Sequence, residues 1–299
     1  MRRPLVMALL GIASAVAAPA AEPEITHAFL AAGGATYIRG GDGAVLWTYP
    51  QGTRDAWLLP DGNRLLAVSK GQAYPGGGAV EVTPSGEVVF EYKGTQSEVN
   101  TVQAVGPDRY MVSEAGDRPR LLEVDRRGKV VAEVPLKAQT KDHHLQTRMA
   151  RKLANGNYLV PQLLDKVVRE YTPAGAVVWE VKTADMPFTA IRLDDGNTLI
   201  GCTLGNHVIE VDPAGKTVWR VGNDDLPGNP INDACGVQRL PNGNTVITSH
   251  HAHGDEVKLT EVTRAKRVVW THRDPQTPGI HHVQILDTNG KALTGRPLR

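Results

Sequence analysis

The sequence predicts an all-β protein, a six-bladed β-propeller. One motif recurs six times at a spacing of about 40 to 50 residues, and each copy carries two turns between short β-like stretches. The clearest copy starts as V-I-E-V-D-P-A-G-K-T-V-W at Val208 and continues as V-Q-R-L-P-N-G-N-T-V-I-T to Thr248. A repeat of this length, built from short strands and glycine turns, is typical of propeller blades.

Each copy contains four strand-like stretches, which in one copy are Gly236–Leu240, Thr245–Thr248, Lys258–Val262 and Val268–Thr271. The first two are joined by an Asn-Gly or Asp-Gly turn, because both residues tolerate a positive φ and so favour tight hairpins. This turn recurs as Asp61-Gly62, Asn155-Gly156, Asp195-Gly196, Asn242-Gly243 and Asn289-Gly290.

One position of the motif is usually aromatic. We expect these rings to pack between neighbouring blades, since a large ring at a fixed blade position buries much area. Ala132 replaces the ring in one copy and should leave a thinner contact there. The six residues at this position are Trp47, Phe90, Ala132, Trp179, Trp219 and Trp270.

The copies are out of phase with the ends of the sequence. His281–Asp287 is a leading strand without a following aromatic, so we expect it to complete the blade begun by Ala35–Thr48. The N- and C-terminal segments would then pair and leave no free sheet edge. Phe29–Ala32 and Lys291–Leu298 compete for the remaining place in that blade.

Composition and the first residues suggest an exported protein. Residues 1–21 have a basic start, an apolar run and small residues at the end, as in a signal peptide, so a secreted or periplasmic protein is expected. Residues 22–299 form one predicted propeller domain, expected to be a monomer.

The remaining composition excludes two classes of partner. The net charge of +1 gives no basic surface of the kind that binds nucleic acid, and no later apolar run is long enough for a membrane span. Cys202 and Cys235 either form a disulfide or remain buried thiols.

The second turn of each copy, Pro213-Ala214-Gly215 in the clearest one, joins the third and fourth stretches. Strand direction alternates within a blade, so the Asn-Gly turns and these second turns share one face, which we call the turn face. The remaining loops share the opposite face, the loop face, and eight of the ten histidines are assigned to it. A polar channel mouth on loops held by rigid strands is a common ligand site. Residues expected to bind a ligand there are Arg54, Asp55, Asn100, Asn232 and Asp233.

Three groups of histidines stand out on the loop face. His143-His144 and His281-His282 begin inner strands, where alternate side chains point in opposite directions, so one histidine of each pair is expected to reach a ligand. The third group, in one loop, is either a set of metal ligands or a set of solvated side chains. It consists of His250, His251 and His253.

The pattern V-D-P-A-G-K-T-V-W from Val211, followed by V-Q-R-L-P-N-G-N-T-V-I from Val237, resembles the repeats of two families. One is the PQQ-like repeat propellers and the other is the bacterial arylsulfotransferase-like propellers. The segments D-H-H-L-Q-T-R-M-A-R-K-L-A-N-G-N from Asp142 and I-H-H-V-Q-I-L-D-T-N-G from Ile280 are similar to the inner strands of the second family. The second resemblance implies sulfuryl transfer, with His282 or His281 as the covalent carrier and His143 or His144 and Arg148 as partners. The first implies PQQ and Ca²⁺, but the sequence itself requires neither PQQ nor a divalent metal.

Two functions follow from these observations. The first is an exported binding module that holds a small polar or saccharide-like ligand, or a protein, on the loop face of the channel. The alternative is a histidine-dependent enzyme at the same place, acting as a sulfuryl transferase, lyase or hydrolase. The distances among the loop-face histidines distinguish them, because a catalytic site requires these groups to converge.

Overall fold

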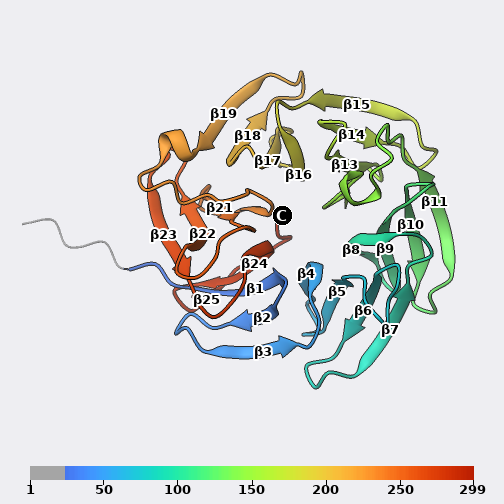
Figure 1. Cartoon of the computed structure of the whole chain (residues 1–299), viewed down its shortest axis with the longest axis horizontal. Coiled ribbons are helices and arrows are strands. Elements are labelled where there is room, and N and C mark those ends of the chain that lie inside the picture. Colours follow the sequence, from blue (N-terminus) through green and yellow to red (C-terminus); the bar gives the residue numbers. More distant parts are fainter. Residues whose placement is uncertain (1–23) are drawn as a thin grey trace, which may run out of the picture.

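A computed structural model describes residues 24–299 of the chain. They form six antiparallel sheets around a central channel, which confirms the predicted six-bladed propeller (Figure 1). The signal peptide predicted over residues 1–21 lies outside the described residues. Within residues 24–299, no helix has the length and apolar character needed to cross a bilayer.

Five of the six sheets contain four consecutive strands each. In each of them the first strand lies at the channel and the fourth at the perimeter (Figure 1). The five blades are β4 Thr53–Leu58, β5 Arg64–Val68, β6 Gly78–Val82 and β7 Val88–Lys93; β8 Glu98–Gly106, β9 Arg109–Ala115, β10 Arg120–Asp125 and β11 Val130–Pro135; β12 Arg151–Lys152, β13 Tyr158–Gln162, β14 Val167–Tyr171 and β15 Val177–Lys182; β16 Met186–Arg192, β17 Thr198–Thr203, β18 His207–Val211 and β19 Thr217–Gly222; and β20 Val237–Arg239, β21 Thr245–Thr248, β22 Val257–Val262 and β23 Val268–Arg273.

The sixth sheet closes the ring with both ends of the described chain. Its order is β25-β24-β1-β2-β3, and β24 pairs antiparallel with β1, so the predicted closure is confirmed. Of the two segments that could fill the remaining place in this blade, Phe29–Ala32 does so, as part of β1 between β24 and β2. The five strands are β1 His27–Gly33, β2 Thr36–Arg39, β3 Val45–Tyr49, β24 Ile280–Thr288 and β25 Lys291–Ala292.

The chain after β25 enters the central channel (Figure 1). Leu293 N donates a hydrogen bond to Leu286 O at 2.8 Å, and Arg239 N donates one to Leu298 O at 2.9 Å. The tail, residues 293–299, therefore runs along the inside of the channel from the turn face. Its last side chain, Arg299, is fully buried.

The aromatic rings pack between blades, as predicted. Phe90 stacks on Tyr110 of the next blade with the ring centroids 3.9 Å apart. Trp219 Nε1 donates a hydrogen bond to Arg264 O of the next blade at 2.9 Å. Ala132 is exposed and supplies no ring at this position. The recurring aromatic thus joins one blade to the next around the ring.

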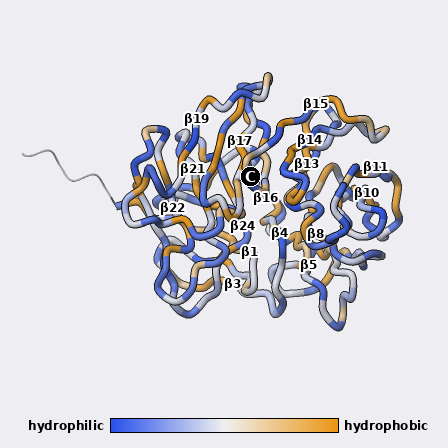
Figure 2. The backbone as a smooth tube through the Cα atoms, turned by 45° about the horizontal axis from the view of Figure 1, so that its top comes forward, coloured by the Kyte–Doolittle hydropathy of each residue, from blue (hydrophilic) through white to orange (hydrophobic). Residues whose placement is uncertain are grey.

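A buried glutamate in the third strand of five blades adds a polar link. In one of them, Glu210 accepts a hydrogen bond from Asn197 of the turn at 2.9 Å and one from Arg239 of the next blade at 2.9 Å. A buried carboxylate requires such partners. The five residues are Glu81, Glu123, Glu170, Glu210 and Glu261. Hydrophobic stretches, in orange, recur in strands around the ring (Figure 2).

Candidate functional site

Four inner strands contain a β-bulge close to the loop face. In β24, His282 pairs with Ala32 and Ile280 pairs with Gly33, so His281 between them has no opposite residue. A bulge of this kind bends the strand and redirects the extra side chain, and bulges are common next to active sites. The corresponding extra residues are Arg54 in β4, Asn100 in β8 and Phe188 in β16.

Arg148 and Cys235 occupy the same place in the other two blades, where the inner strand begins later. Arg148 N donates a hydrogen bond to Pro161 O at 3.4 Å, and the residue after Cys235, Gly236, accepts one from Thr248 N at 2.9 Å. Each blade thus contributes one residue to a ring at the loop-face opening of the channel, which we call the mouth ring. It consists of Arg54, Asn100, Arg148, Phe188, Cys235 and His281.

Several members of the mouth ring touch one another. The guanidinium carbon of Arg148 lies 5.8 Å from the centre of the Phe188 ring. Phe188 in turn lies parallel to His281, with centroids 5.8 Å apart. Phe188 also packs with Cys235 in a small apolar cluster. Phe188 was not among the site residues predicted from the sequence.

The mouth ring contains buried polar atoms without partners. Asn100 is fully buried, and neither its amide nitrogen nor its amide oxygen has a hydrogen-bond partner among residues 24–299. The same holds for Arg148 Nε and His281 Nδ1, and for Nδ1 of neighbouring His250. Burying an unsatisfied polar group costs free energy, so such groups are rare in folded proteins and require an explanation. A ligand or bound water at the mouth would satisfy them.

The rings of His250 and His281 are stacked at the mouth, with centroids 3.6 Å apart and an interplanar angle of 18°. His250 comes from the loop between β21 and β22. Burial, with the charge of His251 and against the opposing charge of Asp233, lowers the pKa of His250 to about 4. Burial, followed by the neighbouring His250, places the pKa of His281 well below its usual value. Both imidazoles are therefore uncharged at neutral pH.

Around Glu98, beside the mouth ring, the positive charges of Arg54, Arg148 and Lys70 outnumber the negative charge of Glu98 itself. Arg148 Nη2 and Arg54 Nη2 lie 3.8 and 4.0 Å from the carboxylate of Glu98, which is also contacted at 3.0 Å by both Lys70 Nζ and His144 Nδ1. Burial, followed by the charge of Arg54, lowers the pKa of Arg148 to about 10. Two guanidinium groups thus share a carboxylate that has closer partners, which leaves them available to an anion.

Glu98 remains ionised in this arrangement. Burial alone would raise the pKa of its carboxyl group, but the hydrogen bonds from His144 and Lys70 and the charges of Arg148 and Arg54 hold it at about 2. Glu98 therefore orients the cations and does not act as a proton donor at neutral pH.

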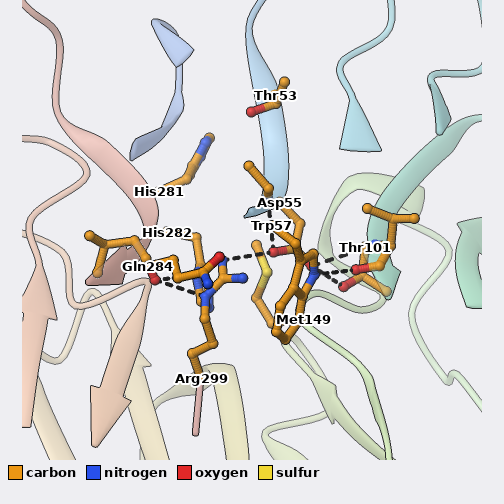
Figure 3. Close-up of polar contacts among 12 residues, drawn as sticks. Thr53, Asp55, Trp57, Thr101, Met149, His281, His282, Gln284 and Arg299 are labelled. Carbon is orange, nitrogen blue, oxygen red and sulfur yellow. Dashed lines mark hydrogen bonds and ion pairs between the residues drawn. The ribbon is translucent and has the colours of Figure 1, made fainter. Parts of the chain in front are cut away.

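A second layer of polar residues, the floor, closes the channel below the mouth ring. Asp55 accepts hydrogen bonds from Arg151 Nη1 at 2.8 Å and from Arg299 Nη2 at 3.2 Å, and Arg299 Nη2 also lies 2.6 Å from His282 Nδ1. Burial would raise the pKa of Asp55, but the two arginines hold it at about 2. Figure 3 shows Asp55, His282 and Arg299 in contact, with His281 pointing away from them.

The floor separates the neighbours that the sequence analysis had grouped together. Arg54 and His281 belong to the mouth ring. The next residues, Asp55 and His282, instead contact Arg299 in the floor. The bulge and the alternation of side chains along a strand explain this difference. A cavity of about 1200 Å³ lies on the turn side of the floor, lined by the tail and by hairpin residues such as Leu59 and Leu240. It is distinct from the mouth.

Other predicted site residues lie around the mouth. His144 bonds Glu98, as described, whereas His143 Nε2 lies 3.1 Å from the exposed carboxylate of Asp117. Asn232 holds a loop by donating from Nδ2 to His251 O at 3.1 Å. Of the three histidines predicted as metal ligands, His250 and His251 come together with Asp233, and His253 lies outside this group. Asp233, His250 and His251 are the described residues that could hold one metal ion.

Both cysteines are free thiols. Cys235 Sγ lies 3.5 Å from Thr203 Oγ1 and 3.7 Å from Asp233 Oδ2. Burial, with the neighbouring carboxylate of Asp233, raises the pKa of the Cys235 thiol well above its usual value. A thiol held in its neutral form is a poor nucleophile, so Cys235 contributes shape rather than reactivity to the mouth.

Comparison with solved structures supports the fold. A protein of unknown function from Bacteroides caccae superposes with a TM-score of 0.76 at 24% identity, covering 86% of this chain and 98% of that chain. A catalytically inactive histidine-to-alanine variant of virginiamycin B lyase from Staphylococcus aureus, with quinupristin, gives a TM-score of 0.57 at 14% identity, covering 83% and 81%. A streptogramin B lyase structure gives 0.57 at 13%, covering 82% and 77%.

These likenesses show the β-propeller fold. No protein-family model and no curated protein matches the sequence. None of the three solved structures is named as a quinoprotein or an arylsulfotransferase, so those two resemblances gain no support from them.

Proposed function

We propose that this protein is an enzyme that acts on a small substrate bearing a carboxylate or a carbonyl group, bound at the mouth ring. One observation carries the proposal: Asn100, Arg148, His250 and His281 lie around the loop-face end of the channel, and each has a buried polar atom without a hydrogen-bond partner within residues 24–299. Catalytic sites keep such groups in place before the substrate arrives, because preorganised dipoles stabilise charge that develops during the reaction.

The cationic side of the mouth would bind the substrate. The planar guanidinium of Arg148 suits the two oxygens of a carboxylate or the single oxygen of a polarised carbonyl. Its nearest carboxylate oxygen is 3.8 Å away, beyond the usual length of a charge-assisted hydrogen bond. Asn100 Nδ2 would donate to the same oxygen. A bound substrate would therefore satisfy two buried groups together.

His281 would supply the chemistry. Its free Nδ1 would accept a proton from the carbon next to the substrate carbonyl, while Arg148 and Asn100 stabilise the negative charge on the oxygen. The electron pair of the broken C–H bond would form a C=C bond as the bond to the leaving group breaks with its own electron pair. His281 would then return the proton to the leaving group. These steps together make an elimination, which is the reaction of a lyase.

Quinupristin is the first compound to test, because the lyase from Staphylococcus aureus was solved with it. Products would be analysed by liquid chromatography and mass spectrometry, since elimination leaves the total mass unchanged whereas hydrolysis adds one water. A panel of small esters and hydroxy acids with a proton next to the carbonyl would follow. Products containing one added water would replace the lyase proposal with a hydrolase.

The His281→Gln variant tests the role of this side chain. We expect kcat to fall roughly 100-fold or more, the usual contribution of a positioned base, with KM and the thermal midpoint nearly unchanged. His143→Gln is the matched control, because the imidazole of His143 lies 3.1 Å from the exposed carboxylate of Asp117, outside the mouth ring. Full turnover in His281→Gln would overturn the proposal, and tight binding without turnover in the unaltered protein would favour the binding module.

We also propose that the protein acts outside the cytoplasm as a monomer. Export is supported by the basic and apolar pattern of residues 1–21. Fractionation of producing cells, with mass spectrometry of the mature N-terminus, tests export. Sedimentation of the purified protein tests the oligomeric state.

A further inference from the structure

We propose that Asp233, His250 and His251 form a binding site for one divalent transition-metal ion at the edge of the mouth. One possible ligand atom from each residue lies within 4.8 Å of the other two. The inference goes beyond the proposed function, which requires no metal. It also differs from the expectation based on the sequence, because a carboxylate from a distant loop replaces His253.

The backbone holds the two segments of this site together. His250 N donates to Asp233 O at 3.1 Å, and His251 N donates to Asn232 O at 3.2 Å. Asn232 Nδ2 also donates to His251 O at 3.1 Å. The relative position of the three side chains thus rests on paired main chains rather than on a free loop. Preorganised ligands of this kind lower the cost of binding a metal.

The carboxylate of Asp233 is oriented by its other contacts. Its Oδ1 accepts hydrogen bonds from Leu204 N at 2.8 Å and from Thr203 Oγ1. The remaining oxygen, Oδ2, faces His251, whose Nδ1 lies 3.2 Å away. Hydrogen bonds to the non-ligating oxygen of a carboxylate commonly orient it toward a metal. One oxygen of Asp233 is thereby directed at the proposed site.

The spacing suits a small tetrahedral ion. Ligands bonded at about 2.0 to 2.1 Å and arranged tetrahedrally lie about 3.3 Å from one another. The 3.2 Å between Asp233 Oδ2 and His251 Nδ1 matches that edge. The third donor is available, because His250 Nδ1 has no hydrogen-bond partner within residues 24–299 and its ring is held by the stack on His281.

The donor set indicates the class of ion. Two imidazole nitrogens and one carboxylate oxygen suit Zn²⁺ and related transition metals, whereas Ca²⁺ and Mg²⁺ are bound mainly by oxygen. Three protein ligands leave a fourth position for water or for a substrate atom, as in catalytic zinc sites. The site would lie beside the stacked His281 and so within the proposed active site.

Metal binding is measured on the purified protein after dialysis against a chelator, with Zn²⁺ by calorimetry and with Co²⁺ by its visible absorption. We expect one ion per chain and absorption bands typical of four-coordinate Co²⁺. His251→Ala should weaken Zn²⁺ binding roughly 100-fold or more and abolish the rise in thermal midpoint that Zn²⁺ causes. His251 is exposed, so this change should leave folding intact.

His253→Ala is the matched control, since His253 is an exposed histidine of the same loop that lies outside the group. Its Kd for Zn²⁺ should stay within about twofold of the unaltered value. Absence of stoichiometric binding, or an equal loss in His253→Ala, would overturn the metal site. His281 supplies no ligand atom, so His281→Gln should bind Zn²⁺ more tightly than His251→Ala does, although it loses the stack on His250. A failure of the proposed activity and a failure of this site therefore give different results.

Discussion

His250 and His281 stack with their ring centroids 3.6 Å apart, although they belong to different blades. His281 lies on β24, which is part of the blade that closes the ring, and His250 follows β21 in the preceding blade. β24 pairs with β1 in the sheet that closes the ring, so the stack joins the closing blade to the preceding one. The candidate site depends on the same long-range pairing that closes the propeller.

Asn100 is expected to reduce stability in the free protein. Replacing it by leucine, which has a similar size, removes two buried unsatisfied atoms and should raise the free energy of unfolding by about 1 to 3 kcal/mol. Urea unfolding measures the change. Ligand binding at the mouth should be lost at the same time, because functional residues are often poor for stability.

Thr101→Val is the control for this prediction. Thr101 Oγ1 donates to Asp55 Oδ2 at 2.9 Å and accepts from Arg151 Nη1 at 2.8 Å. Its loss should lower the free energy of unfolding by about 1 to 3 kcal/mol. If both variants were destabilised equally, Asn100 would be a structural residue whose partners are bound waters.

Asp55 and Arg54 are neighbours with opposite expected effects on stability. Asp55→Asn leaves Arg151 and Arg299 without their carboxylate in a fully buried layer and should destabilise the protein by about 3 to 5 kcal/mol. Arg54→Gln should change stability by about 0.5 kcal/mol or less, because its nearest carboxylate oxygen is 4.0 Å away. The urea midpoints of Asp55→Asn and Arg54→Gln compare their stabilities directly. Similar losses of stability in the two variants would contradict the assignment of Arg54 to the mouth ring and Asp55 to the floor.

Mild acid should destabilise the protein through His272. Burial, with the charges of Arg39 and Lys258 and against the opposing charge of Asp274, lowers the pKa of His272 to about 4. The unfolded chain binds this proton near pH 6.5, so the stabilisation is present above that pH and is lost as pH falls toward 4.

His272→Gln measures this contribution. Between pH 6.5 and 4 the unaltered protein should lose about 3 kcal/mol more of its free energy of unfolding than the variant does. Urea unfolding at several pH values gives both curves. Parallel curves would show that folding does not lower the pKa of His272.

Trp219 should stabilise the contact between two blades. Trp219→Ala removes a ring that is 9% exposed and its hydrogen bond to Arg264 O, so a loss of about 3 to 5 kcal/mol is expected. Val218→Ala is the control in the same strand, because Val218 is exposed and should change stability by less than about 0.5 kcal/mol. Thermal and urea unfolding measure the stability of both variants. An equally small loss in Trp219→Ala would contradict the role of this ring in packing one blade against the next.

Much of the scaffold could be read from local patterns. The Asn242-Gly243 turn places Gly243 at a φ of 85°, and the predicted strand Thr245–Thr248 has these bounds in the structure. The predicted strand Val268–Thr271 is two residues longer in the structure, where β23 ends at Arg273. Turn chemistry and side-chain alternation act over a few residues, so a single copy of the repeat contains the information for its own hairpins.

The site could be predicted only in part. Arg54, Asn100, Arg148 and His281 were expected at the mouth, but Phe188 was missed because it is apolar and lies in a strand without histidines. A signal was present: Phe188 holds the same repeat position as the other members of the mouth ring. Reading that position in every copy, whatever the residue, would have identified it.

The sequence by itself determined the number of blades, the turns and the aromatic wedges, because these follow from local geometry repeated six times. The tertiary structure decided which residue of each adjacent pair faces the mouth, since a bulge depends on the partner strand and not on the residue alone. It also decided that His250 meets His281 and that Arg299 reaches Asp55. Those contacts join segments that become neighbours only through ring closure and the entry of the tail into the channel.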